Sequence, residues 1–374
     1  MNERLDSPTL TIDLAALSAN WRLLAAKAGP AQCAAAVKAD AYGIGLEPAV
    51  GALAKAGCTT FFVAHCSEGV KARTALRAAG HNGRIYILNG GPLSAPMAEL
   101  YLRFGLQPVL NSVAELQFWR TITATTHNPP AAALHFNTGM NRLGFDKSDE
   151  INLDGVPFDL VMSHFVSAEC PEDADNQSQI AAFTEIVTRF PGVTASLANS
   201  SGIFLPANPH FDMVRPGYAL YGGNPLPGSS NPMQPVVQLD VPVLQIRTIE
   251  AGARVGYNGQ WTAQRRTRLA TLSLGYADGF PRIAGHVDTA PDHRAQALIA
   301  GVLCPFVGRT SMDLTVLDIT AVDPAAIELG SRAQILGRHI TIDDLAERSG
   351  TIGYQILTSL GARFTRHYTP APVH

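Results

Sequence analysis

The chain has 374 residues, of which 46% are hydrophobic and 16% charged, and its formal net charge is −3 at pH 7. This composition is that of a soluble globular protein, and the length predicts two domains, with one large barrel as the alternative. Dispersed charge of this balance argues against a nucleic-acid partner, and no apolar run approaches the length of a membrane span.

The cysteine and histidine patterns indicate a compartment and argue against a metal site. The five cysteines are odd in number and form no CxxC pair, which is typical of reduced thiols in the cytosol. The segment Met1–Ala16 has no basic start followed by an apolar stretch, so no secretory signal is predicted. The eleven histidines show no HExxH spacing. We therefore expect a cytoplasmic protein without a bound metal.

The first predicted element is a helix over 14–28, with Asp13 as its N-cap and Gly29-Pro30 at its end. Short apolar runs then alternate with mostly amphipathic stretches. Eight strands alternating with helices over about 200 residues predict a (β/α)8 barrel. A doubly wound sheet would also alternate, but no GxGxxG follows the first strand. The predicted strands are 34–38, 61–66, 84–88, 107–110, 132–136, 159–163, 194–198 and 213–215.

The sequence changes character after a stretch rich in Pro, Gly, Ser and Asn at 224–235. Strand-like segments separated by glycine-rich turns follow, with one predicted helix at about 341–349. The sequence therefore predicts an α/β plus all-β protein. Its N-terminal (β/α)8 TIM-like barrel would span 12–230, and a C-terminal β-strand-rich domain would span 231–374. The strands expected in the second part are 236–249, 268–275, 297–308, 315–319 and 333–337.

Lys38 ends a short apolar segment, where a buried ammonium group is unfavourable unless it is paired or neutral. One explanation is a deprotonated amine that forms a Schiff base; the other is a lysine that extends its charge to water. The active sites of (β/α)8 barrels lie at the C-terminal ends of the strands. Other polar residues fall at predicted strand ends, which favours a functional site there: His135, Asn137, Arg142, His164, Asn199, Ser200 and Arg215.

The run AAAVKADAYGIG around Lys38 resembles the pyridoxal-phosphate attachment site of alanine racemases, and six further blocks follow in the family's order. The resemblance implies a pyridoxal-phosphate-dependent isomerase. It would be a homodimer that interconverts L-alanine and D-alanine and supplies D-alanine for peptidoglycan. It also implies that residues 1–11 form a strand packing on the C-terminal domain. The further blocks are HFNTGMNRLGF (135–145), ANSSG (198–202), FDMVRPGYALYG (211–222), SLGYADGFPR (273–282), VGRTSMD (307–313) and GTIGYQIL (350–357).

The resemblance also assigns contacts with the cofactor. Lys38 would carry it, and Arg215 would face its pyridine nitrogen. Because a guanidinium keeps its proton, the ring nitrogen would stay unprotonated, which favours racemisation over transamination. Small residues after the last two strands would let backbone N–H groups approach a phosphate, although on their own they are equally an ordinary Ser/Gly turn. The other implied cofactor contacts are Tyr42, His164, Asn199, Ser200, Gly217, Tyr218 and Tyr354.

Racemisation needs acid–base groups on both faces of the α-carbon, and the resemblance assigns these to Lys38 and Tyr276. A tyrosine in such a position is otherwise a half-buried packing residue, and a phenol with a pKa of about 10 is a poor base at neutral pH. The resemblance implies His164 and Arg215 as the neighbours that would polarise it. Tyr276 would enter the barrel of the partner chain in a head-to-tail dimer. The implied substrate contacts are Arg142, the backbone N–H of Met312, and Tyr354, which would narrow the entrance.

Two positions depart from the family pattern. His135 stands where many members carry a carbamylated lysine, and Asn137 stands where an aspartate is usual. The negative partner of Arg142 is thereby missing, and either a bound anion or direct contact with His135 would replace it. The second departure is Ile44, in place of the histidine of YGHG, which we expect to be peripheral.

Two other functions stay open. A racemase of broader amino-acid specificity would carry similar motifs, although Tyr354 and the lack of a signal peptide argue against it. A non-catalytic pyridoxal-phosphate-binding protein of the same fold would lack a second domain. Residues 236–374, with Tyr276 and Met312, therefore argue against that function.

Overall fold

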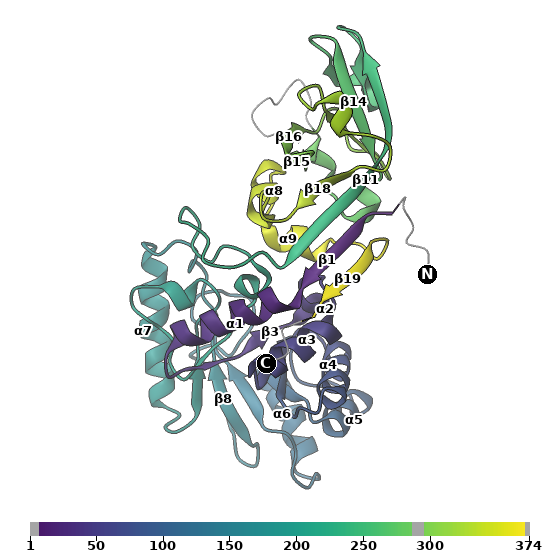
Figure 1. Ribbon diagram of the computed structural model, residues 1–374. Helices are drawn as coiled ribbons and strands as arrows, with labels where there is room; N and C mark the ends of the chain where they lie inside the picture. Colours follow the sequence, from purple (N-terminus) through teal and green to yellow (C-terminus); the bar gives the residue numbers. More distant parts are fainter. Residues whose placement is uncertain (1–6, 286–294, 371–374) are drawn as a thin grey trace. The chain divides into compact units, whose positions relative to one another are not determined.

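The computed structural model describes residues 7–285 and 295–370, which fall into two compact units (Figure 1). We call them the barrel unit and the strand-rich unit. The predicted segments 1–11 and 231–374 extend in part beyond the described residues. The barrel unit consists of Leu17–Leu220 and Asn224–Met233, and the strand-rich unit of the chain up to Ala16, Tyr221–Gly223 and the chain from Gln234 onward.

The barrel unit is built on parallel strands in a nearly closed ring, in the order β2-β10-β9-β8-β7-β6-β5-β4-β3. Ala34 alone separates β2 from β3; β2 pairs with β10 and β3 with β4, so the two form one strand that completes the ring. The predicted TIM-like barrel is thereby confirmed. Its strands are β2 Gln32–Cys33, β3 Ala35–Ala36, β4 Thr60–Val63, β5 Arg84–Ile87, β6 Gln107–Leu110, β7 Ala132–His135, β8 Phe158–Met162, β9 Thr194–Ser196 and β10 Met213–Val214.

The strands are apolar because both of their faces are covered, by helices outside and by packed side chains inside. The interior holds small residues beside a few large ones, among them Phe62 and Tyr86. These two rings stack with centroids 5.0 Å apart. The Tyr86 hydroxyl donates to Asp159 at 2.7 Å, and Gln107 donates to the same carboxylate at 3.1 Å. The barrel is therefore a filled core, with a polar cluster at the N-terminal end of its strands.

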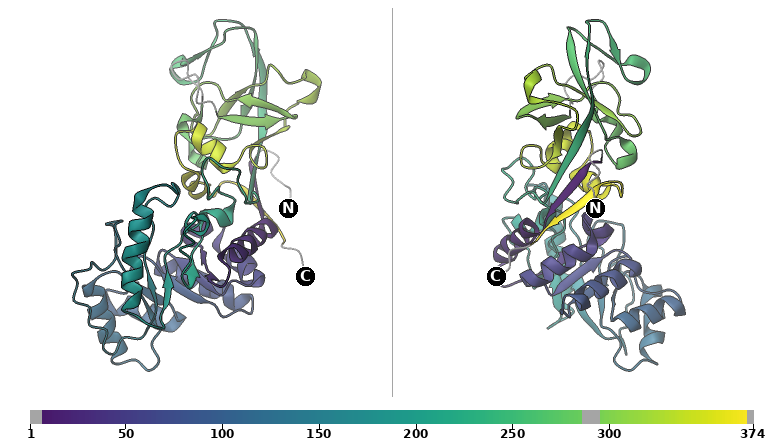
Figure 2. Two further views of the ribbon diagram at one scale, coloured as in Figure 1. Left: turned by 90° about the vertical axis from the view of Figure 1, so that its left-hand side faces the viewer. Right: turned by 45° about the vertical axis from the view of Figure 1, so that its right-hand side comes forward.

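Apart from the short turn α2 at the end of β3, the helices of the barrel unit lie outside the ring of strands (Figures 1 and 2). The first helix begins directly after Asp13, whose carboxylate accepts the backbone N–H of Ala16 at 2.8 Å, so the predicted helix 14–28 and its cap are confirmed. None of the helices in the described part of the chain combines the length and the apolar run needed to cross a bilayer. The helices of the barrel unit are α1 Leu14–Ala28, α2 Lys38–Tyr42, α3 Leu46–Ala56, α4 Cys66–Ala78, α5 Ala95–Phe104, α6 Val113–Thr123 and α7 Ala174–Thr188.

The alternation of strands and helices weakens in the second half of the barrel, all of which is described. The segment 136–157 after β7 forms no helix, because it has glycines at positive φ and no helical apolar period. Single 3-10 turns follow the last two strands, at Gly202–Phe204 after β9 and Tyr218–Tyr221 after β10. Eight full helices, as simple alternation would suggest, are therefore not formed.

The strand-rich unit is organised around one long strand, β11, which Figure 1 shows beside β1, with β19 on the other side of β1. β11 pairs antiparallel with β1, β18 and β14, and β1 pairs parallel with β19. Its register shifts twice, which lets one strand serve different partners along its length. The strands are β1 Thr9–Asp13, β11 Val237–Ile249, β12 Arg254–Val255, β13 Trp261–Thr262, β14 Thr267–Leu272, β15 Gln296–Ile299, β16 Val302–Pro305, β17 Thr315–Asp318, β18 Arg332–Leu336 and β19 Thr365–Thr369.

Two details of this unit bear on the predictions. The predicted helix at 341–349 is present as α8 Ile342–Arg348, with the Thr341 hydroxyl accepting the Asp344 N–H at 3.1 Å. The predicted single strand 297–308 is wrong, because β15 and β16 form a hairpin that reverses at Ala300 and Gly301. Both of these turn residues have positive φ, which a continuous strand does not permit. A further helix, α9, spans Gly353–Thr358.

Candidate active site

The barrel gathers the predicted polar residues at the end of the ring where the parallel strands terminate. His135 is the last residue of β7, Arg215 follows β10 directly, and Lys38 stands two residues after β3. The others lie in the loops after β7, β8, β9 and β10: Asn137, Arg142, His164, Asn199, Ser200, Gly217 and Tyr218. One face of the barrel unit therefore carries all the site residues predicted for it, apart from Tyr42 in the turn after Lys38, treated next.

Lys38 is followed by a left-handed turn. Ala39, Asp40, Ala41 and Tyr42 all have φ between 53° and 55°, so α2 is one turn of left-handed helix. Such a conformation costs roughly 1–2 kcal/mol for each L-residue, and none of these residues is Gly or Asn. The turn is closed by hydrogen bonds, including Ala41 N–H to the Val37 carbonyl at 3.0 Å. It places the Tyr42 side chain in the interior.

The environment of Lys38 favours a neutral amine. Burial is the main cause that lowers its pKa, and the positive charge of Arg142 adds to it, whereas Glu68 acts in the opposite direction. A lysine with a lowered pKa is a better nucleophile at neutral pH than an exposed one. Lys38 is half-buried, so part of its surface stays exposed within the chain.

Arg215 is buried and is held by oxygen acceptors and an aromatic face. Its guanidinium donates to the Ser196 hydroxyl at 2.6 Å and to the Ser163 carbonyl at 2.5 Å. It also lies over the Phe62 ring, 5.8 Å from the centroid. Burial lowers the pKa of Arg215 to about 9, which still leaves the group protonated at neutral pH. No ion pair in the described part of the chain involves it.

His164 lies beside Arg215. The arginine nitrogen is 3.5 Å from Nδ1 of the imidazole, and a guanidinium can only donate, so Nδ1 is the acceptor and the ring proton is on Nε2. Burial, followed by the charges of Arg215 and Arg142, holds the pKa of His164 well below its usual range. A neutral imidazole next to a protonated guanidinium follows from this arrangement.

His135 is also neutral, and its tautomer follows from its partner. Nδ1 lies 2.7 Å from the Asn111 side-chain oxygen, while the Asn111 amide donates to the Val109 carbonyl at 2.9 Å and, more weakly, to the Leu88 carbonyl. The oxygen of Asn111 must therefore accept a proton that His135 carries on Nδ1. Burial, then Arg215 and then Arg142, lower the pKa of His135 to about 4. Its Nε2 is thus left as an acceptor.

Asn137 organises its own loop. Its amide donates to Asn141 at 3.0 Å and to Asp146 at 2.9 Å, and its oxygen accepts the backbone N–H groups of Gly139 and Asn141. Arg142, on the same loop, is exposed and takes part in none of the ion pairs between described residues. The negative partner expected for Arg142 is therefore not supplied by an ion pair within the described residues.

The loops after β9 and β10 form a close-packed set of hydroxyl and N–H groups. A Cβ at Gly217 would stand 2.3 Å from the Tyr42 hydroxyl, so only glycine permits this approach. The Ser200 hydroxyl accepts the N–H groups of Gly217 and Ala219, both at 3.1 Å. Asn199 accepts the N–H of Gly202 at 2.8 Å. A 3-10 turn is too short for a strong dipole, so hydroxyl and N–H groups would bind an anion here.

These groups fit the cofactor expected from the sequence. A phosphate prefers hydroxyl and backbone N–H donors, such as those around Ser200 and Tyr42. An aldehyde reacts with a neutral amine, and the lowered pKa of Lys38 favours that form. A pyridine nitrogen accepts a hydrogen bond from a fixed donor such as Arg215.

Three predicted site residues belong to the strand-rich unit. Tyr276 opens a 3-10 turn, Tyr276–Asp278, and its backbone N–H donates to Ser311 at 3.1 Å. Met312 is the next residue along, and its carbonyl accepts the Ala277 N–H at 2.9 Å, so the Tyr276 and Met312 segments are adjacent. Tyr354 lies on α9. Tyr276 and Met312 are 42% and 54% exposed, which is high for residues of this size.

Sequence reasoning missed several residues that support the site. Glu68 accepts the backbone N–H of Ala39 in the turn after Lys38, and Asn111 fixes the tautomer of His135. The only available signal for Glu68 was its place three residues into a helix, where a capping glutamate is common. No sequence pattern links Asn111 to His135, because the contact joins the ends of neighbouring strands.

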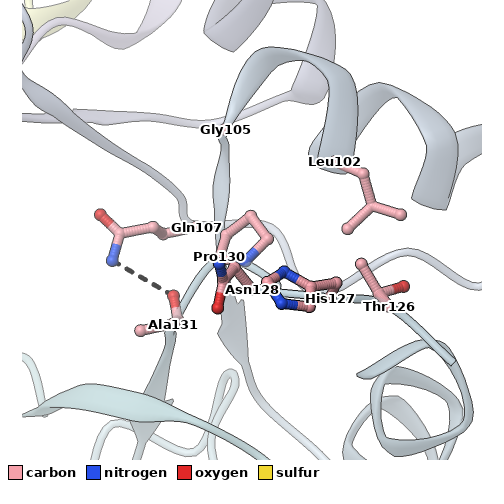
Figure 3. Close-up of a pocket in the computed structure, with 8 residues that line it drawn as sticks. All are labelled: Leu102, Gly105, Gln107, Thr126, His127, Asn128, Pro130 and Ala131. Carbon is pink, nitrogen blue, oxygen red and sulfur yellow. Dashed lines mark hydrogen bonds between the residues drawn. The ribbon is translucent and has the colours of Figure 1, made fainter. Parts of the chain in front are cut away.

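The pocket in Figure 3 lies elsewhere on the barrel unit, at the N-terminal ends of β6 and β7. Gln107 donates there to the Ala131 carbonyl at 3.2 Å, and Leu102, His127 and Asn128 complete much of the wall. Active sites of this fold lie at the opposite strand ends. None of the predicted site residues lines this pocket.

Comparisons with known proteins agree with one another. Residues 12–225 match the family model of the alanine racemase N-terminal domain, and residues 236–368 match that of the C-terminal domain. The chain is 51% identical over 365 residues to an alanine racemase of Methylobacterium sp. (strain 4-46), covering 96% of this chain and 97% of the relative. It is 43% identical over 366 residues to a catabolic alanine racemase of Rhizobium johnstonii, with 96% and 94% covered.

A solved structure gives the same picture. The fold is similar to that of the alanine racemase from Bartonella henselae with covalently bound pyridoxal phosphate, with a TM-score of 0.89 and 36% sequence identity. The similarity covers 97% of this chain and 99% of that one. It therefore extends over both units.

Proposed function

The chain belongs to the alanine racemase family, and from that premise we propose that it interconverts L-alanine and D-alanine with pyridoxal phosphate as cofactor. The observation that carries the proposal is the half-buried Lys38 at the same barrel end as the protonated Arg215 and the neutral His164. When bound, pyridoxal phosphate supplies an aldehyde that bonds to amines and a ring that accepts charge from the α-carbon. The residues of the chain then decide where protons go.

Arg215 sets the reaction type in this proposal. It is protonated at neutral pH and has no acidic partner among the described residues, so it offers the ring nitrogen a hydrogen bond without giving up a proton. Its contacts with Ser196, Ser163 and Phe62 fix the direction of the guanidinium. An unprotonated ring draws less charge from the α-carbon, which favours return of the proton there and disfavours transamination.

Two residues would move the proton at the α-carbon. Lys38 would act on one face, and its lowered pKa favours the neutral amine that can accept a proton. Tyr276 of the partner subunit would act on the other face, as the family resemblance implies. Its exposed ring supports this role, because a side chain that completes a site in another subunit must project from its own.

Three further residues would bind and select the substrate. Arg142 is an exposed cation close enough to affect the pKa of Lys38, and it would orient the substrate carboxylate. The backbone N–H of Met312 would bind the same carboxylate, and Tyr354 would restrict the side chain to a small one. His135 would support Arg142 through its free Nε2 acceptor, in place of a charged bridge.

The proposed biological role is to supply D-alanine for peptidoglycan in the cytoplasm. Catabolic alanine racemases are among the relatives, so the role is tested separately from the chemistry. Expression of the chain should restore growth to a bacterium that requires D-alanine. A chain that racemises alanine in vitro but does not restore growth at comparable expression would contradict this role.

The proposed reaction is tested with the purified holoenzyme. L-Alanine and D-alanine should each be converted to an equal mixture, and a panel of L-amino acids with larger side chains should react much more slowly. Borohydride reduction followed by peptide mapping should place the reduced cofactor on Lys38. Rapid racemisation of large substrates would indicate a broad-specificity racemase, and cofactor binding without turnover would indicate a non-catalytic binding protein.

A further inference from the structure

We infer that Glu68 is a positioning residue for Lys38: its carboxylate ties the left-handed turn after the lysine to the next strand end of the barrel, and so fixes where the amine lies. The inference rests on the proposed function, in which Lys38 is the group that reacts.

Glu68 contacts three backbone N–H groups from two loops. One carboxylate oxygen accepts the Ala39 N–H at 2.6 Å, and the other accepts the N–H groups of Ala64 at 2.8 Å and His65 at 3.1 Å. Ala39 is the residue after Lys38, whereas Ala64 and His65 directly follow β4. One side chain therefore bridges the C-terminal ends of β3 and β4.

The turn itself needs this support at its first residue. Its internal hydrogen bonds join Ala41 to Val37 and Gly43 to the Ala39 carbonyl, and the Asp40 side chain accepts the Leu46 N–H at 2.9 Å. These bonds hold the middle and the end of the turn. The backbone N–H of Ala39, the residue after Lys38, donates its hydrogen bond to the Glu68 carboxylate. A backbone in the left-handed region persists only where such contacts hold it.

Glu68 also supplies the negative charge that faces Lys38. Arg142, from the loop after β7, lowers the pKa of the lysine, and Glu68, from α4, raises it. His164, from the loop after β8, is neutral and is itself influenced by Lys38. The Glu68 carboxylate thus limits how far burial and Arg142 lower the pKa of Lys38.

The chain offers a matched control in Glu115. It stands third in α6, as Glu68 does in α4, and reaches back to the loops before it: it accepts the N–H of Asn111 at 2.8 Å and of Gly91 at 3.3 Å. The two residues form the same kind of clamp on different strand ends. Only the Glu68 clamp includes the turn after Lys38.

The test compares Glu68→Gln, Glu68→Asp and Glu115→Gln with the wild type. The pKa of Lys38 is measured on the cofactor-free chain, from the pH dependence of its acetylation by trace acetic anhydride and mass spectrometry. Thermal midpoints, kcat and KM for alanine are measured on the holoenzymes. Thermal midpoints control for the stability that each clamp contributes.

Glu68→Gln should lower the pKa of Lys38 by roughly half a unit to one unit, because a facing negative charge is lost. Its kcat should fall about tenfold with a smaller change in KM, since the amine is no longer fixed. Glu68→Asp should keep the charge and hence most of the pKa, but its shorter side chain should still lose kcat. Glu115→Gln should lower the thermal midpoint similarly and leave the pKa of Lys38 unchanged.

The inference is overturned if the pKa of Lys38 and kcat in Glu68→Gln change no more than in Glu115→Gln. It is also overturned if Glu68→Asp retains full kcat. The acetylation measurement needs neither cofactor nor turnover. A wild-type chain that does not racemise alanine would therefore refute the proposed function, and the pKa comparison would still decide the contact between Glu68 and the turn.

Discussion

The barrel unit and the strand-rich unit present their candidate site residues in opposite ways. In the barrel, Arg215 and His135 are buried and hydrogen-bonded to the ends of neighbouring strands. In the strand-rich unit, Tyr276 and Met312 have much of their side-chain surface exposed on adjoining turns. The first set finds its hydrogen-bond partners within its own unit, whereas the second leaves large residues partly exposed.

The difference follows from how each unit places a side chain. Closure of a parallel ring forces strand ends together, so polar groups there find partners and acquire shifted pKa values, as at His135 and Lys38. A turn between antiparallel strands exposes its residues, and a large exposed side chain commonly marks a surface that meets another one. This contrast supports our proposal that Tyr276 completes a site in a partner subunit.

The largest expected effects come from substituting one residue in each unit, Lys38 in the barrel unit and Tyr276 in the strand-rich unit. Lys38→Ala should abolish the visible cofactor absorbance together with racemisation, because the covalent link is lost. Tyr276→Phe should keep the absorbance and lower kcat in both directions of racemisation by about 10²–10⁴-fold, because each direction needs an acid–base group on both faces of the α-carbon. Absorption spectra and polarimetry measure the two effects, and thermal midpoints control for folding.

The contrast between the two units would be contradicted if Lys38→Ala and Tyr276→Phe had the same effects on absorbance and activity. A Tyr276→Phe chain with full activity in both directions would remove the residue from the chemistry. A Lys38→Ala chain that still shows the reducible chromophore would move the attachment site to another lysine.

A smaller effect is expected at Arg215. Arg215→Glu would place an acid where a guanidinium stands, so the ring nitrogen would gain a proton and become a stronger acceptor of charge. Racemisation should fall by about 10²-fold while the transamination side reaction rises and the visible spectrum changes. Pyruvate release and absorbance measure this partition. An unchanged ratio of the two reactions would rule out the role assigned to Arg215.

The smallest expected effect concerns stability and pH at His135. Its pKa is about 4 in the folded chain, against 6.5 for an ordinary histidine, so the unfolded chain binds a proton first as the pH falls. The neutral ring thus contributes stability above pH 6.5 that is lost progressively toward pH 4. Replacement by glutamine removes this dependence.

The measurement compares the free energy of unfolding of wild type and His135→Gln at pH 7 and pH 5. The wild type should lose about 2 kcal/mol more than the variant between these values. Parallel losses in the two proteins would mean that His135 is not held neutral.

Much of the barrel could be predicted from the sequence, because strands covered on both faces appear as short apolar runs. The helix after Asp13 and the one after Thr341 were equally accessible, since each begins with a capping side chain. The irregular segment 136–157 and the hairpin at Ala300 and Gly301 were harder to predict. Simple alternation suggests a helix in the first, and continuous apolar content suggests a single strand in the second.

The site was predictable only as far as single residues show their chemistry. Lys38 and Arg215 are unusual at strand ends, and the motifs around them carry the family resemblance. The left-handed turn after Lys38 has no such signal, because alanine and tyrosine do not mark positive φ. The contact between His135 and Asn111 depends on two strand ends meeting in space, and a single sequence does not display that pairing.

The central claim is a composite site made of Lys38 from one chain and Tyr276 from another, and mixing inactive variants tests it most directly. Lys38→Ala and Tyr276→Phe chains are combined under conditions of demonstrated subunit exchange. About half of the dimers would be hybrids with one intact site, so the mixture should regain roughly a quarter of wild-type activity. No recovery, with exchange verified by mass spectrometry and each variant inactive alone, would contradict the shared site.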